Sequence, residues 1–473
     1  MIGAGLAVLA LSAPARAGRP TDGTGLFSFD ASDVIESVDG PAGLVRVHYS
    51  VNGPNQVRMT DADKDGVPDF AWQVATTAEA VLELYEATGF RLPISESEMG
   101  LTELGGSDAL DFYLVDFGGS ADGQFGLDTC RDGVCSGYMV MENDFSGYGY
   151  ANLTTAIRTL TSHELFHGVQ FAYTDDEPSW MAEGTATWAE YLFDPASDDF
   201  LWLASLYMDD PTRGLDRSPS GVSAWDYGTS LFFSFLDQTL GTQSMVDLQE
   251  QMGALGGGDA SLDALQATIE DQGSTLPEVW TTFADWNLAS GERAGVAESY
   301  PFAADLPGIT ARNEGASLDE TDRVYPLATL YLRIDHPGGE LWWGTADDPT
   351  GLALSLHAVA DGAADGPVDE ASDVFWPDAP GAMLLGDLPA GGYWVAMSQP
   401  DLGDGGSVAL SYCMGTADAL APCGLSVGGG DTADTGGEPP KTKGCGCSGV
   451  GGVNAAWLPG LLGLLVVGRR RRR

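Results

Sequence analysis

Two histidines four residues apart, His163 and His167, lie in a segment with a helical pattern of apolar residues. From residue 152 to about residue 173 apolar side chains recur at helical spacing, and Asn152 suits an N-terminal cap, so a helix buried on one side is predicted. Histidines at positions i and i+4 project from one face of a helix and can hold one Zn²⁺, while Glu164 between them can reach a water molecule on the metal. The alternative is a helix with two packed histidines.

A catalytic zinc needs a third protein ligand and one open position. Residues 179–193 are predicted to form a second helix, on which Glu183 and Glu190 share a face. The segment 180–186, W-M-A-E-G-T-A, is similar to the W-x-x-E-G-x-A block of gluzincin peptidases. This resemblance implies that Glu183 is the third ligand, with Glu190 as the alternative or as a residue that supports a ligand.

The spacing departs from the best-known gluzincins in one respect, because the 15 residues between His167 and Glu183 are slightly fewer than usual. The metzincin pattern does not apply, since its third histidine would fall at Tyr173. The other histidines, His48, His336 and His357, show no ligand spacing and are predicted to be core or surface residues.

The gluzincin resemblance also implies a mechanism, in which Glu164 takes a proton from water and passes it to the leaving amine. Peptide hydrolysis further needs a hydrogen-bond donor for the tetrahedral oxyanion, and Tyr227 is the candidate. The alternative for Tyr227 is a packed aromatic residue at the start of a helix. Residues 137–141, G-Y-M-V-M, are predicted either as an edge strand that pairs with an extended peptide or as a core strand.

A second metal site is predicted at residues 61–69, D-A-D-K-D-G-V-P-D, which have carboxylates at positions 1, 3, 5 and 9 and a glycine at position 6. Position 12 is Trp72 and not glutamate, so the segment is no full EF-hand and resembles the shorter calcium loops of dockerin and thrombospondin-type repeats. The alternative is an aspartate-rich turn that caps the following helix. The candidate ligands of a structural Ca²⁺ are Asp61, Asp63, Asp65 and Asp69.

The pattern of apolar residues divides the chain. Residues 27–302 mix helix and strand patterns and hold the motifs above, so an α+β, zincin-like metallopeptidase domain is predicted. Residues 303–423 change to short alternating strands with Gly, Pro and Asp turns, which predicts an all-β, sandwich-like domain. Its L-P-A-G-G-Y turn resembles the C-terminal β-domains of many secreted bacterial peptidases. Residues 424–444, rich in Gly, Thr, Asp and Pro, are predicted to be a flexible linker.

About half of the chain resembles a family of secreted myxobacterial metalloproteases. The matching segments are His48-Tyr49, 61–70, 89–93, the two helices of the zinc motif and 227–232. The resemblance implies a class of enzyme, and it does not name a substrate.

Both ends of the chain carry predicted targeting signals. Residues 1–17 are mostly small or apolar and end in A-R-A, which predicts a secretory signal, although a basic start is missing and a buried strand is the alternative. At the other end, 445–473 contain Cys445-Gly446-Cys447, an apolar segment long enough to be transmembrane, and five arginines. This order resembles the C-terminal sorting tag of myxobacterial surface proteins, which implies cleavage by a processing machinery and attachment to the cell surface. A plain tail anchor is the alternative.

Charge and cysteine content agree with secretion. The formal charge of −48 repels nucleic acid and anionic membrane surfaces, and it argues against both as partners. Two local cysteine pairs, Cys130 with Cys135 and Cys413 with Cys423, are predicted to form disulfides, as an oxidising compartment allows.

Three functions remain open from the sequence. The first is an active peptidase that acts on protein or peptide substrates, and the intact Glu164 favours it. The second is a surface binding or adhesion protein with a vestigial zinc site, and the third is a zinc hydrolase that acts on other bonds.

Overall fold

The computed structural model describes residues 18–23, 27–218, 223–360, 366–400, 402 and 406–427. They belong to one compact unit that ends at Ser426, apart from Val427. The predicted signal, the sorting tag with its apolar segment and nearly all of the linker lie outside these residues. Within the described part, no helix is both long enough and apolar enough to cross a membrane.

The first sheet has five strands in the order β1-β2-β3-β5-β4. The β2–β3 and β3–β5 pairs are parallel, whereas β1 and β4 run antiparallel to their neighbours. Residues 137–141 therefore lie in an internal strand, β5, and β4 is the outer strand beside it. The strands are β1 (Ile35–Asp39), β2 (Val45–Ser50), β3 (Leu110–Val115), β4 (Gly123–Arg131) and β5 (Val134–Glu142).

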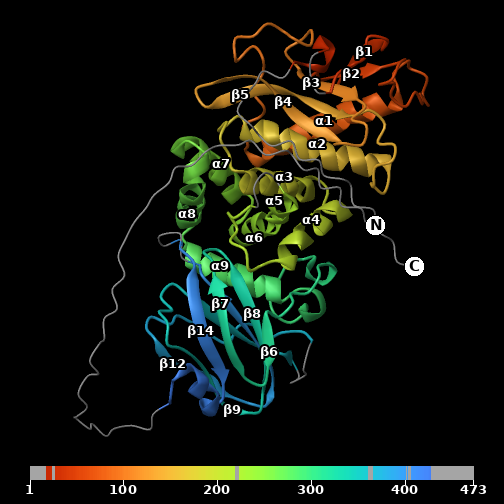
Figure 1. Ribbon diagram of the computed structural model, residues 1–473. Helices are drawn as coiled ribbons and strands as arrows, with labels where there is room; N and C mark the ends of the chain where they lie inside the picture. The colour runs from red at the N-terminus through yellow and green to blue at the C-terminus, as the bar shows by residue number, and fades with distance from the viewer. Residues whose placement is uncertain are drawn as a thin grey trace, which may run out of the picture. The chain divides into compact units, whose positions relative to one another are not determined.

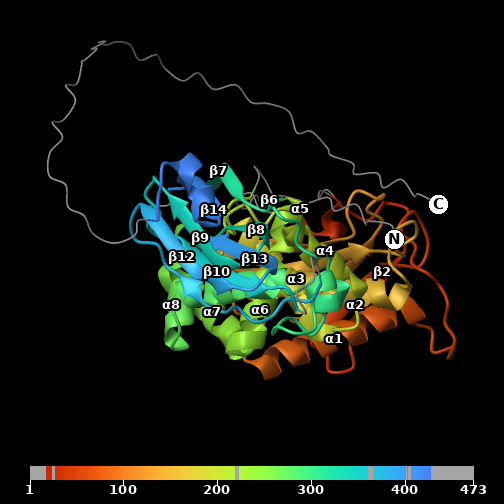
Figure 2. The same ribbon diagram turned by 90° about the horizontal axis from the view of Figure 1, so that it is seen from below.

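Helices α1 (Asp69–Thr88) and α2 (Leu153–Gln170) contact this sheet and lie side by side (Figure 2). Asn152 caps α2, because its side-chain oxygen accepts a hydrogen bond from the Thr155 N–H at 3.0 Å. From Ala156 to Gln170 nearly every side chain of α2 is buried, so the helix that carries the histidine motif is a central element of the core.

Further helices follow α2 in the chain (Figure 1) and contribute aromatic side chains to the core. Phe232 and Phe235 of α6 contact Phe283 and the tryptophans of α9 edge-on or tilted, arrangements that aromatic rings prefer. The helices are α3 (Ser179–Phe193), α4 (Asp198–Asp209), α5 (Ala224–Gly228), α6 (Ser230–Leu240), α7 (Gln243–Leu255), α8 (Ser261–Asp271) and α9 (Leu276–Leu288).

The C-terminal part forms two antiparallel sheets, apart from the parallel strand β6, in the orders β11-β10-β13-β8-β6 and β12-β9-β14-β7. Both sheets contribute to one hydrophobic core, with Trp343 and Tyr412 from one and Leu332 and Val395 from the other. The strands are β6 (Asn313–Gly315), β7 (Leu318–Val324), β8 (Thr329–His336), β9 (Gly339–Thr345), β10 (Ala353–Ala358), β11 (Val374–Phe375), β12 (Gly381–Leu388), β13 (Gly391–Ser398) and β14 (Val408–Gly415).

These sheets also pack on the helices, since α9 contacts β10 and β13. The Tyr331 hydroxyl donates to the Ala284 carbonyl at 2.9 Å, and His357 Nε2 lies 2.9 Å from Asp285 Oδ1. The predicted α+β class is confirmed, with mixed sheet and helices first and strands last. Both predicted disulfides, Cys130–Cys135 and Cys413–Cys423, are present.

A buried arginine ties the N-terminal segment to the first sheet. Arg19 is 4% exposed, and its guanidinium forms a two-pronged pair with Asp128 of β4 at 2.9 and 2.6 Å. It also contacts the carboxylates of Glu96 and Asp111, and it donates to the Tyr113 hydroxyl at 2.9 Å. Three buried acids from separate segments therefore share one arginine, and Asp111 also lies 2.8 Å from His48 Nε2.

Candidate metal centre

Helix α2 presents His163 and His167 on one face, one turn apart, with ring centroids 5.0 Å from each other. Helix α3 crosses beside them and contributes Glu183. Its Oε2 atom lies 3.3 Å from His163 Nε2 and 3.7 Å from His167 Nε2. The three ligand atoms all lie within 4.8 Å of one another, so the structure brings the predicted zinc ligands together.

The position of Glu183 depends on the residue after it. A Cβ at Gly184 would lie 2.2 Å from Thr229 Oγ1 and 2.7 Å from the Phe233 ring, so only glycine lets α3 approach α6 this closely. The Thr229 hydroxyl donates to the Trp180 carbonyl at 2.6 Å and fixes the first turn of α3. The close approach of the two helices gives a physical reason for Gly184 in the W-x-x-E-G-x-A block.

The Nδ1 nitrogen of each histidine lies within hydrogen-bond distance of a side-chain oxygen. His163 Nδ1 lies 2.7 Å from Glu190 Oε1, and His167 Nδ1 lies 2.7 Å from the side-chain oxygen of Gln170. The Gln170 amide in turn donates to the Ala182 carbonyl at 2.8 Å, which fixes its orientation. An N–H on each Nδ1 leaves both Nε2 atoms free to bind a metal, and neutral imidazole is the form that zinc requires.

The electrostatics of Glu183 favour its ionised form. Burial alone would raise the pKa of this carboxyl, but protonated histidines beside it lower the pKa more. The pKa of Glu183 therefore lies well below the usual range of glutamate. Zinc would bind the two histidines in their neutral form, and two imidazoles with one carboxylate are a donor set that suits catalytic zinc. The residues present therefore fit the metal.

Glu164 is buried beside the histidines on α2, and its side chain makes no hydrogen bond within the described ranges. Burial raises its pKa, against the opposing charges of His167 and His163. A carboxylate that is held close to the ligands but not engaged by a neighbour can accept a proton.

Tyr227 of α5 also lies at this centre. Its ring stacks on His163 with centroids 5.6 Å apart and an interplanar angle of 19°. Burial and the charges of Glu183 and Glu164 raise the pKa of its hydroxyl well above 10, so the hydroxyl keeps its proton and remains a donor. Asp226 caps the same short helix by accepting from the Ser223 N–H at 2.6 Å. Tyr227 is thus both a packed aromatic and a neighbour of the candidate metal ligands.

The sequence did not identify three polar residues here, namely Gln170, Asp122 and Asp199. Gln170 follows His167 by three residues, so helical spacing alone could have placed it near the ring. Asp122 and Asp199 lie in segments far from the motif, and no spacing rule connects them to it. Burial raises the pKa of both carboxyls, that of Asp199 to about 6.

The predicted calcium loop is partly assembled. Ligand atoms of Asp61, Asp63 and Asp69 lie within 4.8 Å of one another. Asp65 is not in this group. Its Oδ1 accepts from the Val67 N–H at 2.8 Å, and the three grouped aspartates likewise accept backbone N–H groups of the loop. Gly66, at position 6 of the loop, has a positive φ, which glycine adopts without strain.

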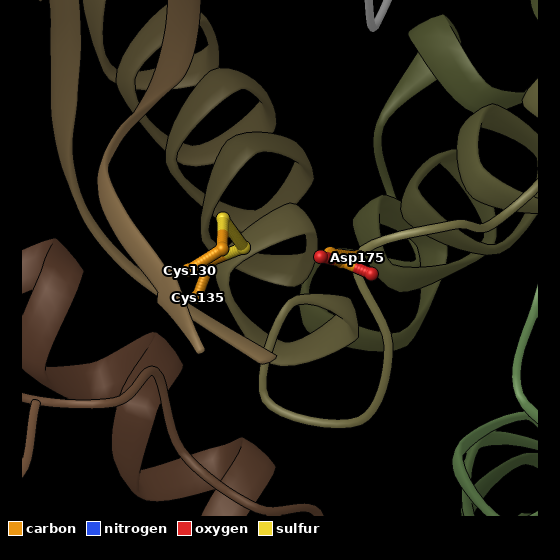
Figure 3. A group of neighbouring side chains, drawn as sticks. All are labelled: Cys130, Cys135 and Asp175. Atoms are coloured by element: carbon orange, nitrogen blue, oxygen red, sulfur yellow. A yellow bond between two sulfur atoms is a disulfide. The ribbon is translucent and has the colours of Figure 1, made fainter. Parts of the chain in front are cut away.

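The described part of the chain contains two further groups of possible ligands, and both include disulfide cysteines. Figure 3 shows Cys130 bonded to Cys135, with Asp175 on a neighbouring segment. A disulfide sulfur carries no thiolate charge for a metal, so neither group is a metal site. His48, His336 and His357 belong to none of the groups found among the described residues.

The chain was compared with known proteins. No family model matches it, and no curated protein matches it. One solved structure, PliG of Aeromonas hydrophila, described as a periplasmic lysozyme inhibitor of g-type lysozyme, is 16% identical over 22% of this chain and 98% of its own length, with a TM-score of 0.17. A score this low carries no argument about fold or function.

Proposed function

We propose that this chain is a zinc-dependent endopeptidase, with a zincin-like catalytic domain followed by a β-sandwich-like domain. One observation carries the proposal: Nε2 of His163, Nε2 of His167 and a Glu183 oxygen converge, and the unengaged Glu164 carboxyl lies beside them. A structural zinc site would not need a carboxyl held in this way.

The chemistry follows from the roles that these residues can fill. Zinc held by His163, His167 and Glu183 would supply the Lewis acidity that polarises a carbonyl and lowers the pKa of water towards about 7. Glu164 accepts the proton of the attacking water and delivers it to the leaving amine. The Tyr227 hydroxyl donates a hydrogen bond to the oxyanion. The outer strand β4, beside α2, offers a free backbone edge to an extended peptide.

Incubation of the purified protein with a peptide library tests this function. Cleavage is expected, and a zinc chelator should stop it until zinc is restored. Cleavage that persists at full rate in the chelator would exclude a zinc mechanism. Binding of zinc with no cleavage of any peptide would favour the adhesion alternative.

The two glutamates of α3 are expected to differ in their effect on zinc. Glu183→Ala removes a ligand and should abolish tight zinc binding. Glu190→Ala removes only the partner of His163 Nδ1 and should lower the affinity for zinc about 10- to 100-fold. Competition with a chromogenic chelator measures both affinities. A larger loss in Glu190→Ala than in Glu183→Ala would make Glu190 the ligand.

We also propose that the 61–69 loop holds a structural Ca²⁺. Calcium should then raise the melting temperature, since a ligand bound only by the folded state adds about 2.7 kcal/mol at a hundredfold excess over its Kd. Asp63→Ala should remove this increase, because Asp63 is one of the three converging carboxylates. Glu83→Ala, an exposed acid on α1, is the control that should keep it. An unchanged calcium-dependent rise in the melting temperature of Asp63→Ala would rule out this loop as the calcium site.

Secretion and surface attachment are part of the proposal, although the two predicted targeting segments, 1–17 and 445–473, lie outside the described residues. Cleavage near Cys445 should remove the five terminal arginines from surface protein, and replacing Cys445 and Cys447 with serine should leave the chain uncut. Intact-mass spectrometry of the surface fraction measures this. Surface protein that retains Arg469 to Arg473 would indicate an ordinary anchor.

A further inference from the structure

Helix α5 (Ala224–Gly228) carries Tyr227 and is only five residues long. A helix this short is not stable by itself, so contacts with its neighbours must fix its position. Helices α3 and α4 both contact it. In the chain Tyr227 is flanked by Asp226 and Gly228, and each of these two residues contacts another segment. The placement of the Tyr227 ring therefore depends on the residues beside it.

The carboxylate of Asp226 connects three segments of the chain, and Asp226 is 0% exposed. Its Oδ2 atom accepts from the Ser223 N–H at 2.6 Å and from the Ser223 hydroxyl at 3.1 Å, at the start of α5. Its Oδ1 atom accepts from the hydroxyl of Ser179, the first residue of α3, at 3.3 Å, and from the hydroxyl of Ser218. An ionised carboxylate only accepts hydrogen bonds, so it can serve all of these donors at once.

The residues that follow Tyr227 hold α5 against α3 and α4. The Thr229 hydroxyl lies 2.6 Å from the Trp180 carbonyl of α3 and 2.6 Å from the Asp226 carbonyl. A Cβ at Gly228 would lie 2.8 Å from a backbone nitrogen of α4, so glycine is needed for this close approach. Contacts on both sides of the tyrosine therefore fix α5.

These contacts place Tyr227 at the candidate metal centre. Its ring stacks on His163, with centroids 5.6 Å apart and an interplanar angle of 19°. The helix whose first residue donates to Asp226 is α3, and one turn later the same helix contributes Glu183. Asp226 thus joins the helix of a candidate metal ligand to the helix of the candidate oxyanion donor.

We propose that Asp226 is a positioning residue, which holds Tyr227 where the tyrosine hydroxyl can donate to the oxyanion. The inference rests on the proposed peptidase function, because an oxyanion forms only if peptides are hydrolysed. Asparagine has the shape of aspartate but a single accepting oxygen, so it cannot serve the donors at both ends of the carboxylate. Asp226→Asn should therefore release Tyr227 while the convergent atoms of His163, His167 and Glu183 stay in place.

A double-mutant cycle in kcat tests the inference. Tyr227→Phe removes one oxyanion donor, and the loss of such a donor lowers kcat about 10²- to 10³-fold. Asp226→Asn should lower kcat at least about tenfold and leave KM and zinc content unchanged, since it weakens a contact made only in the transition state. In the Tyr227→Phe background the same substitution should change kcat less than about twofold, because the group that Asp226 positions is already absent.

Asp237→Asn is the matched control for a general loss of stability. The Asp237 carboxylate of α6 accepts from the Trp188 indole N–H at 3.2 Å and from the Thr242 hydroxyl at 2.6 Å, so it connects α6 to α3 and to the start of α7. Asp237→Asn should lower the melting temperature and leave kcat unchanged. If Asp226→Asn does not fold, the double variant Ser179→Ala, Ser218→Ala removes only the donors to Oδ1 and should give the same result in the cycle.

A crystal structure of the zinc-loaded Asp226→Asn variant gives a readout that does not depend on activity. We expect the Tyr227 ring to leave the face of His163. A ring that keeps its place would overturn the inference, and so would a loss of kcat that Asp226→Asn adds in full to that of Tyr227→Phe. A parent protein that hydrolyses no peptide would overturn the proposed function, whereas the crystal structure would still decide whether Asp226 holds the tyrosine.

Discussion

Replacing Glu164 with glutamine is expected to remove peptide hydrolysis and to leave zinc bound. The substitution keeps the size of the side chain and touches no ligand, since the convergent atoms belong to His163, His167 and Glu183. It removes the group that accepts the proton of water, and general-base catalysis contributes about 10²- to 10⁴-fold to a rate. A fall in kcat of that size, with unchanged zinc content, is the expected result.

A fluorogenic peptide assay and metal analysis on the same preparation measure both quantities. Glu86→Gln, an exposed glutamate on α1, is the matched control and should keep full activity. Hydrolysis by Glu164→Gln at the parent rate would mean that another group activates the water, and loss of zinc would mean that Glu164 supports the site rather than the reaction.

The second large effect is expected at Arg19. Arg19→Ala would leave the buried carboxylates of Glu96, Asp111 and Asp128 without their shared cation. Breaking a buried ion pair by removing one partner costs about 3–5 kcal/mol, because a buried charge is left uncompensated. Urea denaturation should show a loss of at least this size. Arg19→Lys keeps the charge but not the two-pronged geometry and should fall between the parent and Arg19→Ala.

Two comparisons make the Arg19 result specific. Arg46→Ala breaks a pair with Asp39 that is half exposed, and such pairs contribute about 0–1 kcal/mol. Adding Asp128→Asn to Arg19→Ala should recover part of the stability, because it removes one of the uncompensated charges. Equal losses in Arg19→Ala and Arg46→Ala would show that the buried pairs contribute little.

The parts of this protein that follow local patterns were predictable from the sequence. The helical period and the Asn152 cap predicted α2, and the alternating pattern predicted the strands between residues 313 and 415. Local spacing also predicted both disulfides. In each case the residues that make the structure lie close together in the chain, so the pattern contains the information.

The parts that depend on contacts between distant segments were not predictable. Residues 137–141 had a strand pattern, but only the sheet order shows that they are paired on both sides. No pattern in the sequence indicated that Arg19 would meet acids 77 and 109 positions away. Asp65 had the right spacing for a calcium ligand, yet its carboxylate lies outside the group that Asp61, Asp63 and Asp69 form.

Diffraction at the zinc absorption edge, on crystals of the zinc-loaded protein, tests the central claim most directly. We expect one strong anomalous peak about 2.0–2.2 Å from Nε2 of His163, Nε2 of His167 and an oxygen of Glu183, with one position left open to solvent. A peak that is bound by Glu190 in place of Glu183, or that lies away from both histidines, would contradict the proposed catalytic centre.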